Sequence, residues 1–350
     1  MKLDTTVFIL RTVKPNRTIA AFELSSGVSC NSYSEPLQRR LTDFAADSSF
    51  GGAVKKAKEH YGIDVPVSSI RNITISHATN MLQDSIKEIK AIKDIYCKRH
   101  RVKLKAGAKQ IITETDGCMI PVVEINKNVK DKRKKKKLVY KEARLCLSYE
   151  DGQIHPVFAA TMEDTNITGK HLRRTAEKAG LGINSCVHAV GDGAQWIVNQ
   201  LEDKFGDINQ VNYIIDLYHM SEYLSAANAI ITSDEKKQKY LIKRQTKLLK
   251  NNEYQKVLNY FEGYKNADDD NPAMHCYRYM INRPEQFNYK DAIEHKLPIG
   301  SGKVEGGHRH VIQSRLKISG AWWLKENSNA MLALRTNRAN SEWDEYWERL

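Results

Sequence analysis

Apolar residues recur at helical spacing in the N-terminal third of the chain. Within residues 34–81 they are three to four positions apart: Leu37, Leu41, Phe44, Val54, Ala57 and Tyr61. This period places them on one face of a helix. Ser34 and Ser49 are typical helix starts, Gly62 is a typical helix end, and residues 67–80 supply a third helix. The pattern therefore predicts three short helices joined by tight turns.

Three such helices are compatible with a helix-turn-helix DNA-binding module and also with an ordinary three-helix bundle. In the first interpretation the third helix enters the major groove, and four polar side chains near its start face DNA: Ser68, Ser69, Arg71 and Asn72. Residues 5–24 precede the module and read as two short strands around a Lys-Pro-Asn turn. Residues 82–104 follow it and continue as a charged linker helix.

The pattern changes to strands after residue 104. Strands are expected at residues 110–117, 138–149, 155–162, 185–192 and 210–216, with helices at residues 166–180, 194–205 and around 219. Residues 118–125 either continue the first strand or pair with it. Strands followed by alternating helices and strands predict an α/β fold. Residues 233–290 then become strongly charged and mostly helical in pattern.

Length and charge narrow the class of protein. The 350 residues are enough for two or three domains, and 55 Lys and Arg against 42 Asp and Glu give a net charge of +13. Such a charge favours a polyanionic partner, above all nucleic acid, over an unrelated basic enzyme. The run of residues 127–137, KNVKDKRKKKK, is expected to be a solvated loop, with phosphate contact as the alternative.

Two classes of site or location are disfavoured. The six cysteines are scattered without a CxxC pair, which argues against a zinc ribbon. No apolar run has the length of a membrane span, and the N-terminus lacks the layout of a signal peptide. We therefore expect a cytoplasmic, nucleoid-associated protein that has no membrane partner.

Acidic residues stand where the predicted core strands end. Asp116 ends the first core strand, and Asp192 follows a later strand between Gly191 and Gly193. If the two strands are neighbours, their carboxylates meet and require a cation, for which Mg²⁺ or Mn²⁺ is suited. Glu305 begins a probable helix after a glycine-rich turn and could supply a third ligand. For any one of these acids, a turn or capping role is the ordinary alternative.

Cations and two tryptophans follow Glu305. Arg309, Arg315 and Lys317 are expected to bind the phosphates of a nucleic acid substrate. Trp322 and Trp323 could stack on a base that is unpaired at the cleavage site, although one of them is expected in the core.

Several segments resemble the DDE transposases of bacterial insertion sequences, most closely the Kra-type group and its Lre-like relatives. They are, in order, TETDGCMIPV, VGDGAQWI, YIIDLYHMSEYL, PIGSGKVEGGHRHVIQSRLKISGAWW and NAMLALRTNRAN, and the likeness covers roughly residues 35–340. The resemblance implies Asp116, Asp192 and Glu305 as catalytic acids that bind two Mg²⁺ (or Mn²⁺) ions. Asp216 and His219 resemble a supporting Asp-x-x-His motif, while Asp216 could equally cap the next helix.

The resemblance also implies an architecture. The expected fold is α/β, with an RNase H-like catalytic core that an all-α insertion interrupts and a small helix-turn-helix domain precedes. The expected parts are a hairpin, DNA-binding module and linker at residues 1–104, the first part of the core at 105–232, the insertion at 233–296, and C-terminal core helices at 297–350.

The implied activity is metal-dependent cleavage and strand transfer at the ends of an insertion sequence. The expected partners are double-stranded DNA with terminal inverted repeats, target DNA, and further copies of the chain in a homodimer or higher multimer. Two alternatives remain: an RNase H-like nuclease or resolvase without strand transfer, and a catalytically inactive DNA-binding repressor.

Overall fold

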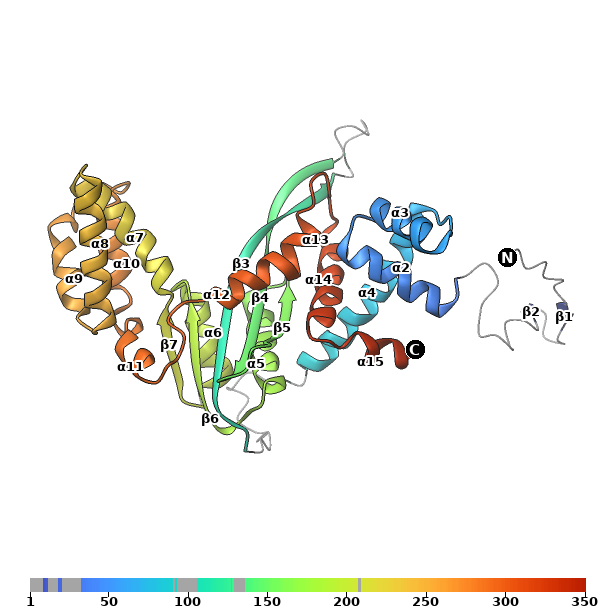
Figure 1. The fold of residues 1–350 in the computed structure, drawn as a ribbon, viewed down its shortest axis with the longest axis horizontal. Helices are drawn as coiled ribbons and strands as arrows, with labels where there is room; N and C mark the ends of the chain where they lie inside the picture. Colours follow the sequence, from blue (N-terminus) through green and yellow to red (C-terminus); the bar gives the residue numbers. More distant parts are fainter. Residues whose placement is uncertain are drawn as a thin grey trace.

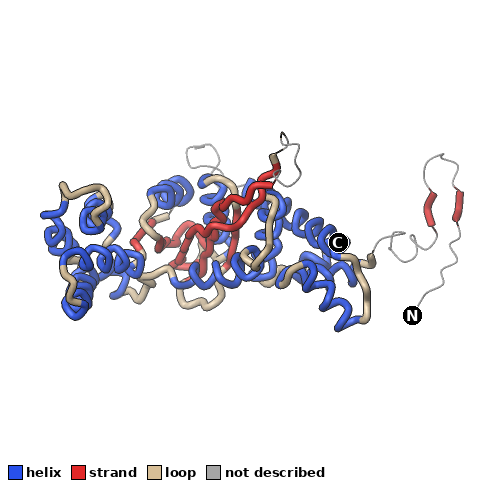
Figure 2. Tube along the Cα trace, turned by 90° about the horizontal axis from the view of Figure 1, so that it is seen from above, coloured by secondary structure: helices blue, strands red, loops and turns tan. Residues whose placement is uncertain are grey.

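The computed structural model describes residues 33–90, 92, 106–126, 128, 136–206 and 209–350, together with the backbone of residues 9–11 and 18–20. The molecule is elongated, with a β-sheet between two groups of helices (Figures 1 and 2). The N-terminal helices lie at one end and the helices of residues 217–294 lie at the other (Figure 1).

The N-terminal group contains a hairpin and three helices. Strands β1 (Ile9–Arg11) and β2 (Thr18–Ala20) pair antiparallel, as the sequence predicted. They precede helices α2 (Glu35–Asp47), α3 (Phe50–Tyr61) and α4 (Val67–Lys90). The three helices enclose a small core that includes Leu41, Ala53, Ala57, Val65 and Ile70. Helix α4 extends ten residues beyond the predicted third helix, whereas most of the predicted linker, residues 93–105, lies outside the described residues. A role of these helices as a helix-turn-helix module stays a prediction.

The central sheet has five strands. They are β3 (Ala108–Ile125), β4 (Lys136–Glu150), β5 (Val157–Thr161), β6 (Leu181–Gly191) and β7 (Val211–Ile215). Their order is β5-β4-β3-β6-β7, in which β4 is antiparallel to both of its neighbours, β3 and β5, while β6 is parallel to β3 and β7 is parallel to β6. This confirms the mixed α/β class, and the order is compatible with an RNase H-like core.

The first core strand is one continuous strand, so the expectation that it ends at Asp116 is wrong. Strand β4 pairs with it from Ile111 to Ile125 and leaves no room for a turn at Asp116 and Gly117. The parallel partner β6 stops earlier, at Gly191. Asp116 therefore lies inside β3, just beyond the point where pairing with β6 ends. The rest of β3 and β4 forms a two-stranded arm that projects from the sheet (Figure 1).

Alternating residues of the strands build two cores, one on each face of the sheet. Helices α5 (Thr165–Lys178) and α6 (Gln195–Phe205) cover one face, where Ile111 and Cys146 meet Leu172 and Leu201. On the other face, Leu145 and its neighbours pack against the C-terminal part of the chain and α4. That part comprises α12 (Gly302–Gly307), the π-helical turn η3 (His308–Gln313), α13 (Ser314–Leu316), α14 (Lys325–Ala339) and α15 (Trp343–Glu348).

A third core belongs to the helices that follow β7. These are α7 (Leu217–Ile231), α8 (Glu235–Lys250), α9 (Tyr254–Phe261), η1 (Glu262–Tyr264), α10 (Pro272–Ile281), η2 (Pro284–Gln286) and α11 (Tyr289–Glu294). Leu224, Leu249, Phe261 and Met280 are among its buried residues. The division into domains at residues 104, 232 and 296 stays a prediction. None of the helices in the described ranges combines the length and apolarity that crossing a membrane requires.

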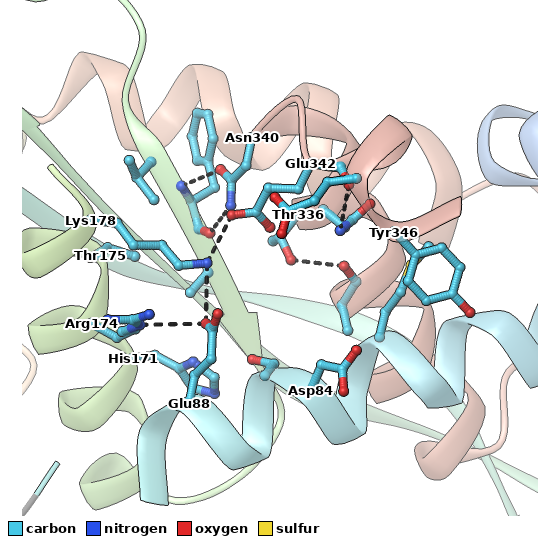
Figure 3. Close-up of a pocket in the computed structure, with 18 of the residues that line it drawn as sticks. Asp84, Glu88, His171, Arg174, Thr175, Lys178, Thr336, Asn340, Glu342 and Tyr346 are labelled. Carbon is cyan, nitrogen blue, oxygen red and sulfur yellow. Dashed lines mark hydrogen bonds and ion pairs between the residues drawn. The ribbon is translucent and has the colours of Figure 1, made fainter. Parts of the chain in front are cut away.

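A polar cavity of about 120 Å³ lies where α4, α5 and α14 meet (Figure 3). Glu88 of α4 forms ion pairs with Arg174 at 3.5 Å and Lys178 at 3.1 Å, and Lys178 also pairs with Glu342 at 2.8 Å. His171 lines the same cavity and is buried. Because the charges here are paired with one another, we interpret the cavity as a structural junction between the N-terminal helices and the sheet.

We expect acid to weaken this junction through His171. Burial lowers the pKa of His171 to about 4, and the nearby Glu88 only partly opposes the shift. A histidine whose folded-state pKa lies below its unfolded value of about 6.5 contributes stability that is complete above pH 6.5 and is lost as the pH falls toward 4. The loss is on the order of 3 kcal/mol at most. Thermal melting between pH 7.5 and 4 should show a shallower fall for His171→Gln than for the wild type, and equal slopes would contradict the assignment.

Candidate functional site

The register of the sheet brings Asp116 and Asp192 to neighbouring positions. In the parallel pair of β3 and β6, Glu114 is opposite Val190. Two residues further along each strand, Asp116 is level with Asp192, which directly follows β6. Successive side chains of a strand point to opposite faces, so Asp116 and Glu114 share one face of the sheet. The two strands are therefore neighbours, which is the condition that the sequence-based prediction required, while the joint binding of a cation by Asp116 and Asp192 stays a prediction.

Helix α10 and the residues after it hold the turn that carries Asp192. The Asp192 side chain accepts a hydrogen bond from the N–H of Ala194 at 2.8 Å. The Tyr279 hydroxyl donates to the carbonyl oxygen of Asp192 at 2.6 Å, and Arg283 Nε donates to that of Gly193 at 2.7 Å. The guanidinium of Arg283 also lies over the Tyr279 ring, 4.3 Å from its centroid. The backbone around Asp192 is therefore fixed from the helical group that follows β7.

Glu114 anchors the helix that carries Glu305. The N–H of Val304 in α12 donates to Glu114 Oε2 at 2.8 Å, and the Tyr149 hydroxyl donates to the same carboxylate at 3.3 Å. Burial raises the pKa of Glu114 to about 7, although these two hydrogen bonds oppose the shift. Because Glu305 is the next residue after Val304, this contact sets the position of Glu305 over the sheet.

Asp216 and His188 anchor the loop that leads into α12. Asp216 Oδ1 accepts the N–H of Tyr218 at 2.6 Å and so caps α7, while Oδ2 accepts the N–H of Ser301 at 2.8 Å and the Ser301 hydroxyl. His188 Nε2, on β6, donates to the carbonyl oxygen of Pro298 at 2.8 Å. The helix-capping alternative for Asp216 thus agrees with the structure. Its carboxylate also supports the site by fixing the loop.

The three predicted catalytic acids are not equally placed. Glu305 is exposed and forms an ion pair with Arg309 one turn further along. Asp116 is 45% exposed, and its Oδ2 lies 3.5 Å from Nε2 of the buried His308. Within the described ranges, no three His, Cys, Asp or Glu side chains are close enough to form a ready-made metal site. The donors are nevertheless all carboxylate oxygens, which is the chemistry that Mg²⁺ and Mn²⁺ require.

His308 contributes a positive charge next to Asp116. Burial alone would lower the pKa of this imidazole, but the proximity of Asp116 and Cys118 outweighs burial and raises the pKa to about 9. Neither ring nitrogen has a hydrogen-bond partner among the described residues, so the contact with Asp116 is an ion pair. The protonated ring and the Asp116 carboxylate therefore neutralise each other in this structure. His308 lies three residues after Glu305, so one helical run carries the predicted third acid and a partner of the first.

His219 lies apart from the acids. Its ring nitrogen Nδ1 is 3.4 Å from Glu222, and the ring packs against Tyr223 and Tyr279 at centroid distances of 5.5 and 6.1 Å. Tyr279 in turn reaches the Asp192 carbonyl. His219 therefore contacts the Asp192 turn through one intervening side chain.

The predicted DNA-binding residues divide into exposed and buried ones. Ser68, Arg71 and Asn72 are exposed at the start of α4, with Ser69 half-buried, and Arg309, Lys317 and Trp322 are exposed in the C-terminal part. Arg315 and Trp323 are buried, at 1% and 5% exposure. Arg315 Nε donates to the carbonyl oxygen of Ala45, and Trp323 Nε1 donates to that of Leu316. The expectation that Arg315 binds the phosphates of a nucleic acid is therefore not met in this structure, because its guanidinium is buried against the Phe50 and Trp323 rings, which also contact each other.

Four residues that hold the site were missed in the sequence: Glu114, His188, Tyr279 and Arg283. Period-two alternation carries a signal for the first two, because Glu114 is two residues before Asp116 and His188 is four residues before Asp192. Each shares a strand face with its acid. Tyr279 and Arg283 carry no such signal, because their partners are 87 and 90 positions away in the sequence.

Two substitutions of Glu114 test whether its hydrogen bond to Val304 or its charge stabilises the fold. Glu114→Ala leaves the buried N–H of Val304 without an acceptor, which costs about 1–3 kcal/mol of unfolding free energy. Glu114→Gln keeps an amide oxygen that can accept the same hydrogen bond, so its loss should be smaller. Urea denaturation of both variants measures the difference, and equal losses would show that the hydrogen bond is not what matters.

Replacing Gly193 should disturb the Asp192 turn. Gly193 has φ of 81°, and a Cβ there would lie 2.5 Å from the Tyr279 hydroxyl oxygen. Gly193→Ala therefore introduces both backbone strain and a clash, and should lower the unfolding free energy by about 1–3 kcal/mol. Gly263→Ala is the matched control, since no atom lies within 4 Å of its Cβ position. Equal denaturation curves for the two variants would contradict this account.

Comparison with known proteins identifies no family for the chain. No family model matches it, and no curated protein matches it. Among solved structures, it is similar to the Drosophila P element transposase strand transfer complex, with 11% sequence identity and a TM-score of 0.29 over 93% of this chain and 83% of that chain. At this distance, residue positions cannot be transferred between the two structures.

Proposed function

We propose that the protein is a DNA transposase that uses Asp116, Asp192 and Glu305 for metal-dependent cleavage and strand transfer at the ends of an insertion sequence. The observation that supports this proposal is the parallel pairing of β3 with β6. The β3–β6 register sets Asp116 level with Asp192, and Glu114 anchors the residue before Glu305 to the same face of β3. The strand order, compatible with an RNase H-like core, supports the same reading.

The three carboxylates would hold two Mg²⁺ ions. Bound there, the ions would activate a water or a 3′-hydroxyl group and stabilise the leaving oxygen of the phosphodiester. In the structure, Arg309 and His308 supply the positive charges that face Glu305 and Asp116. When metal binds, Glu305 would leave Arg309, and the freed guanidinium would lie next to the acids where it can bind a DNA phosphate.

The rest of the chain is well suited to DNA. The net charge of +13 favours a polyanion, and the exposed Arg71 at the start of α4 gives the N-terminal helices a cation for phosphate contact. We therefore assign double-stranded DNA, in the form of terminal inverted repeats and a target, as the substrate. Cutting and joining two element ends together calls for two or more copies of the chain on the DNA.

The direct test uses purified protein and DNA that carries the ends flanking its own coding region, with and without Mg²⁺. We expect Mg²⁺-dependent nicking at the ends that falls by more than about 100-fold in Glu305→Gln and in Asp192→Asn, because a neutral amide is a poor metal ligand. Glu202→Gln, at an exposed position on α6 and away from the acids, is the matched control and should cut normally.

The products distinguish the alternatives. Nicking without joining of the ends to a target would indicate an RNase H-like nuclease or resolvase. Specific binding without any cutting, unchanged by Glu305→Gln, would indicate a repressor and would contradict the catalytic assignment. Full activity of Asp192→Asn would show that the carboxylate pair is not the reaction centre.

A further inference from the structure

A second cavity, of about 500 Å³, opens where three parts of the chain meet. We call it the Trp322 pocket. Its walls come from the starts of α3 and α4, the outer end of the β3–β4 arm and the segment before α14. The lining residues that the argument uses are Phe50, Arg71, Lys136, Arg315, Trp322 and Trp323. Its volume falls within the range of about 300–1,000 Å³ that is typical of ligand sites.

Arg315 is a buried cation with an unused donor in the wall of this pocket. It is 1% exposed, with its guanidinium 4.9 Å from the centroid of the Phe50 ring and 4.7 Å from that of Trp323. Its Nε donates to Ala45, but Nη2 has no partner among the described residues. The buried guanidinium therefore adds a positive charge to the wall of the pocket.

The mouth of the pocket is aromatic and cationic. Trp322 is 62% exposed, an unusual state for so large an apolar ring, and it lies beside the exposed Arg71 and Lys136. Neither of these two cations forms an ion pair with any residue that the structure describes. No described residue of the lining is acidic. The complementary ligand is therefore flat and aromatic, with hydrogen-bond acceptors, and is attached to negative charge.

A nucleotide of DNA matches each of these requirements. A base that leaves the duplex exposes a π-face and acceptor atoms, and its phosphates remain next to it. A peptide segment would match the pocket only if it combined acidic residues for the two cations with an aromatic side chain for Trp322, whereas every nucleotide has both a phosphate and a ring. An unpaired nucleotide is thus the occupant that the chemistry of the pocket favours.

The pocket is distant from the predicted catalytic acids. Trp323 forms a bridge with Val122 on β3, and its carbonyl oxygen accepts the N–H of Val123. Asp116 lies six residues earlier on the same strand, which corresponds to about 20 Å. At about 3.4 Å per nucleotide along one strand, this equals roughly six nucleotides. We therefore place the occupant away from the cut, whereas the sequence-based hypothesis placed it at the cleavage site.

We propose that the Trp322 pocket receives a nucleobase swung out of the DNA duplex about six nucleotides from the cleaved bond, stacked on Trp322, with its phosphates held by Arg71 and Lys136. The proposal rests on DNA being the substrate, as proposed above. Such a pocket would favour DNA sequences in which this base pair opens easily. The protein would then have a sequence preference without hydrogen bonds to the edges of the paired bases.

The test compares binding of two duplexes in EDTA at fixed salt, one fully paired and one with a single unpaired nucleotide. Base–aromatic stacking of about 1–3 kcal/mol corresponds to a preference of roughly 5- to 150-fold for the second duplex. We expect Trp322→Ala to abolish this preference and Trp322→Phe to retain part of it. Tyr240→Ala, which removes an aromatic ring that is 63% exposed on the remote helix α8, is the matched control and should keep it. Arg71→Ala and Lys136→Ala should weaken binding to both duplexes and reduce its salt dependence.

Each result has a separate meaning for the pocket and for catalysis. Equal affinity of the wild type for both duplexes, or an unchanged preference in Trp322→Ala, would overturn the pocket proposal even if Mg²⁺-dependent nicking is present. A preference that depends on Trp322 in a protein that does not nick would support the pocket and overturn the catalytic proposal. Binding of neither duplex would overturn both. Unchanged thermal melting of Trp322→Ala, whose side chain is exposed, verifies that the variant is folded.

Discussion

The hydrogen bond between the Val304 N–H and the Glu114 carboxylate determines where the C-terminal helical run lies on the sheet. A helix on a sheet face can slide if only apolar side chains hold it, because hydrophobic contacts are not directional. A buried hydrogen bond at the first turn of α12 removes that freedom. The contacts of Pro298 with His188 and of Ser301 with Asp216 extend the same constraint to the preceding loop. Contacts with β3, β6 and the start of α7 thus fix the position of residues 298–304.

The Asp192 turn is held in a complementary way. Its backbone carbonyl and that of Gly193 accept hydrogen bonds from Tyr279 and Arg283, which belong to the helical group at the other end of the molecule. Any displacement of that group relative to the sheet would pull on the turn. The helices between β7 and α12 are therefore linked to the candidate site through Tyr279 and Arg283, even though none of the three predicted acids lies in α8 to α11.

The sequence predicted the local features well and the long-range ones poorly. Helix α3 has the expected start at Ser49 and end at Gly62, because capping and left-handed backbone are decided within a few residues. The sequence predicted that the strand ends at Asp116, because Asp-Gly is a turn signal. In the structure the strand continues, because its residues before and after Asp116 pair with β4. Of the two adjacent tryptophans, Trp323 is buried and Trp322 is exposed. The sequence did not predict which of them is buried, because the bridge between Trp323 and Val122 is a long-range contact. An arginine in a basic segment is predicted to be exposed. Arg315 is buried instead, because it packs against Phe50 and Trp323, two rings that are distant from each other in the sequence.

The hydrogen bond that holds α12 also has a consequence for protein synthesis. Glu114 and Val304 are 190 positions apart, so α12 leaves the ribosome long after β3 does. At about 5–20 residues per second, the interval is roughly 10–40 s. During that time the N-terminal helices and most of the sheet strands already exist, while Glu305 and the Trp322 pocket do not. A nascent chain can therefore fold its N-terminal helices well before it has all three predicted acids, and truncated chains would have the first without the second.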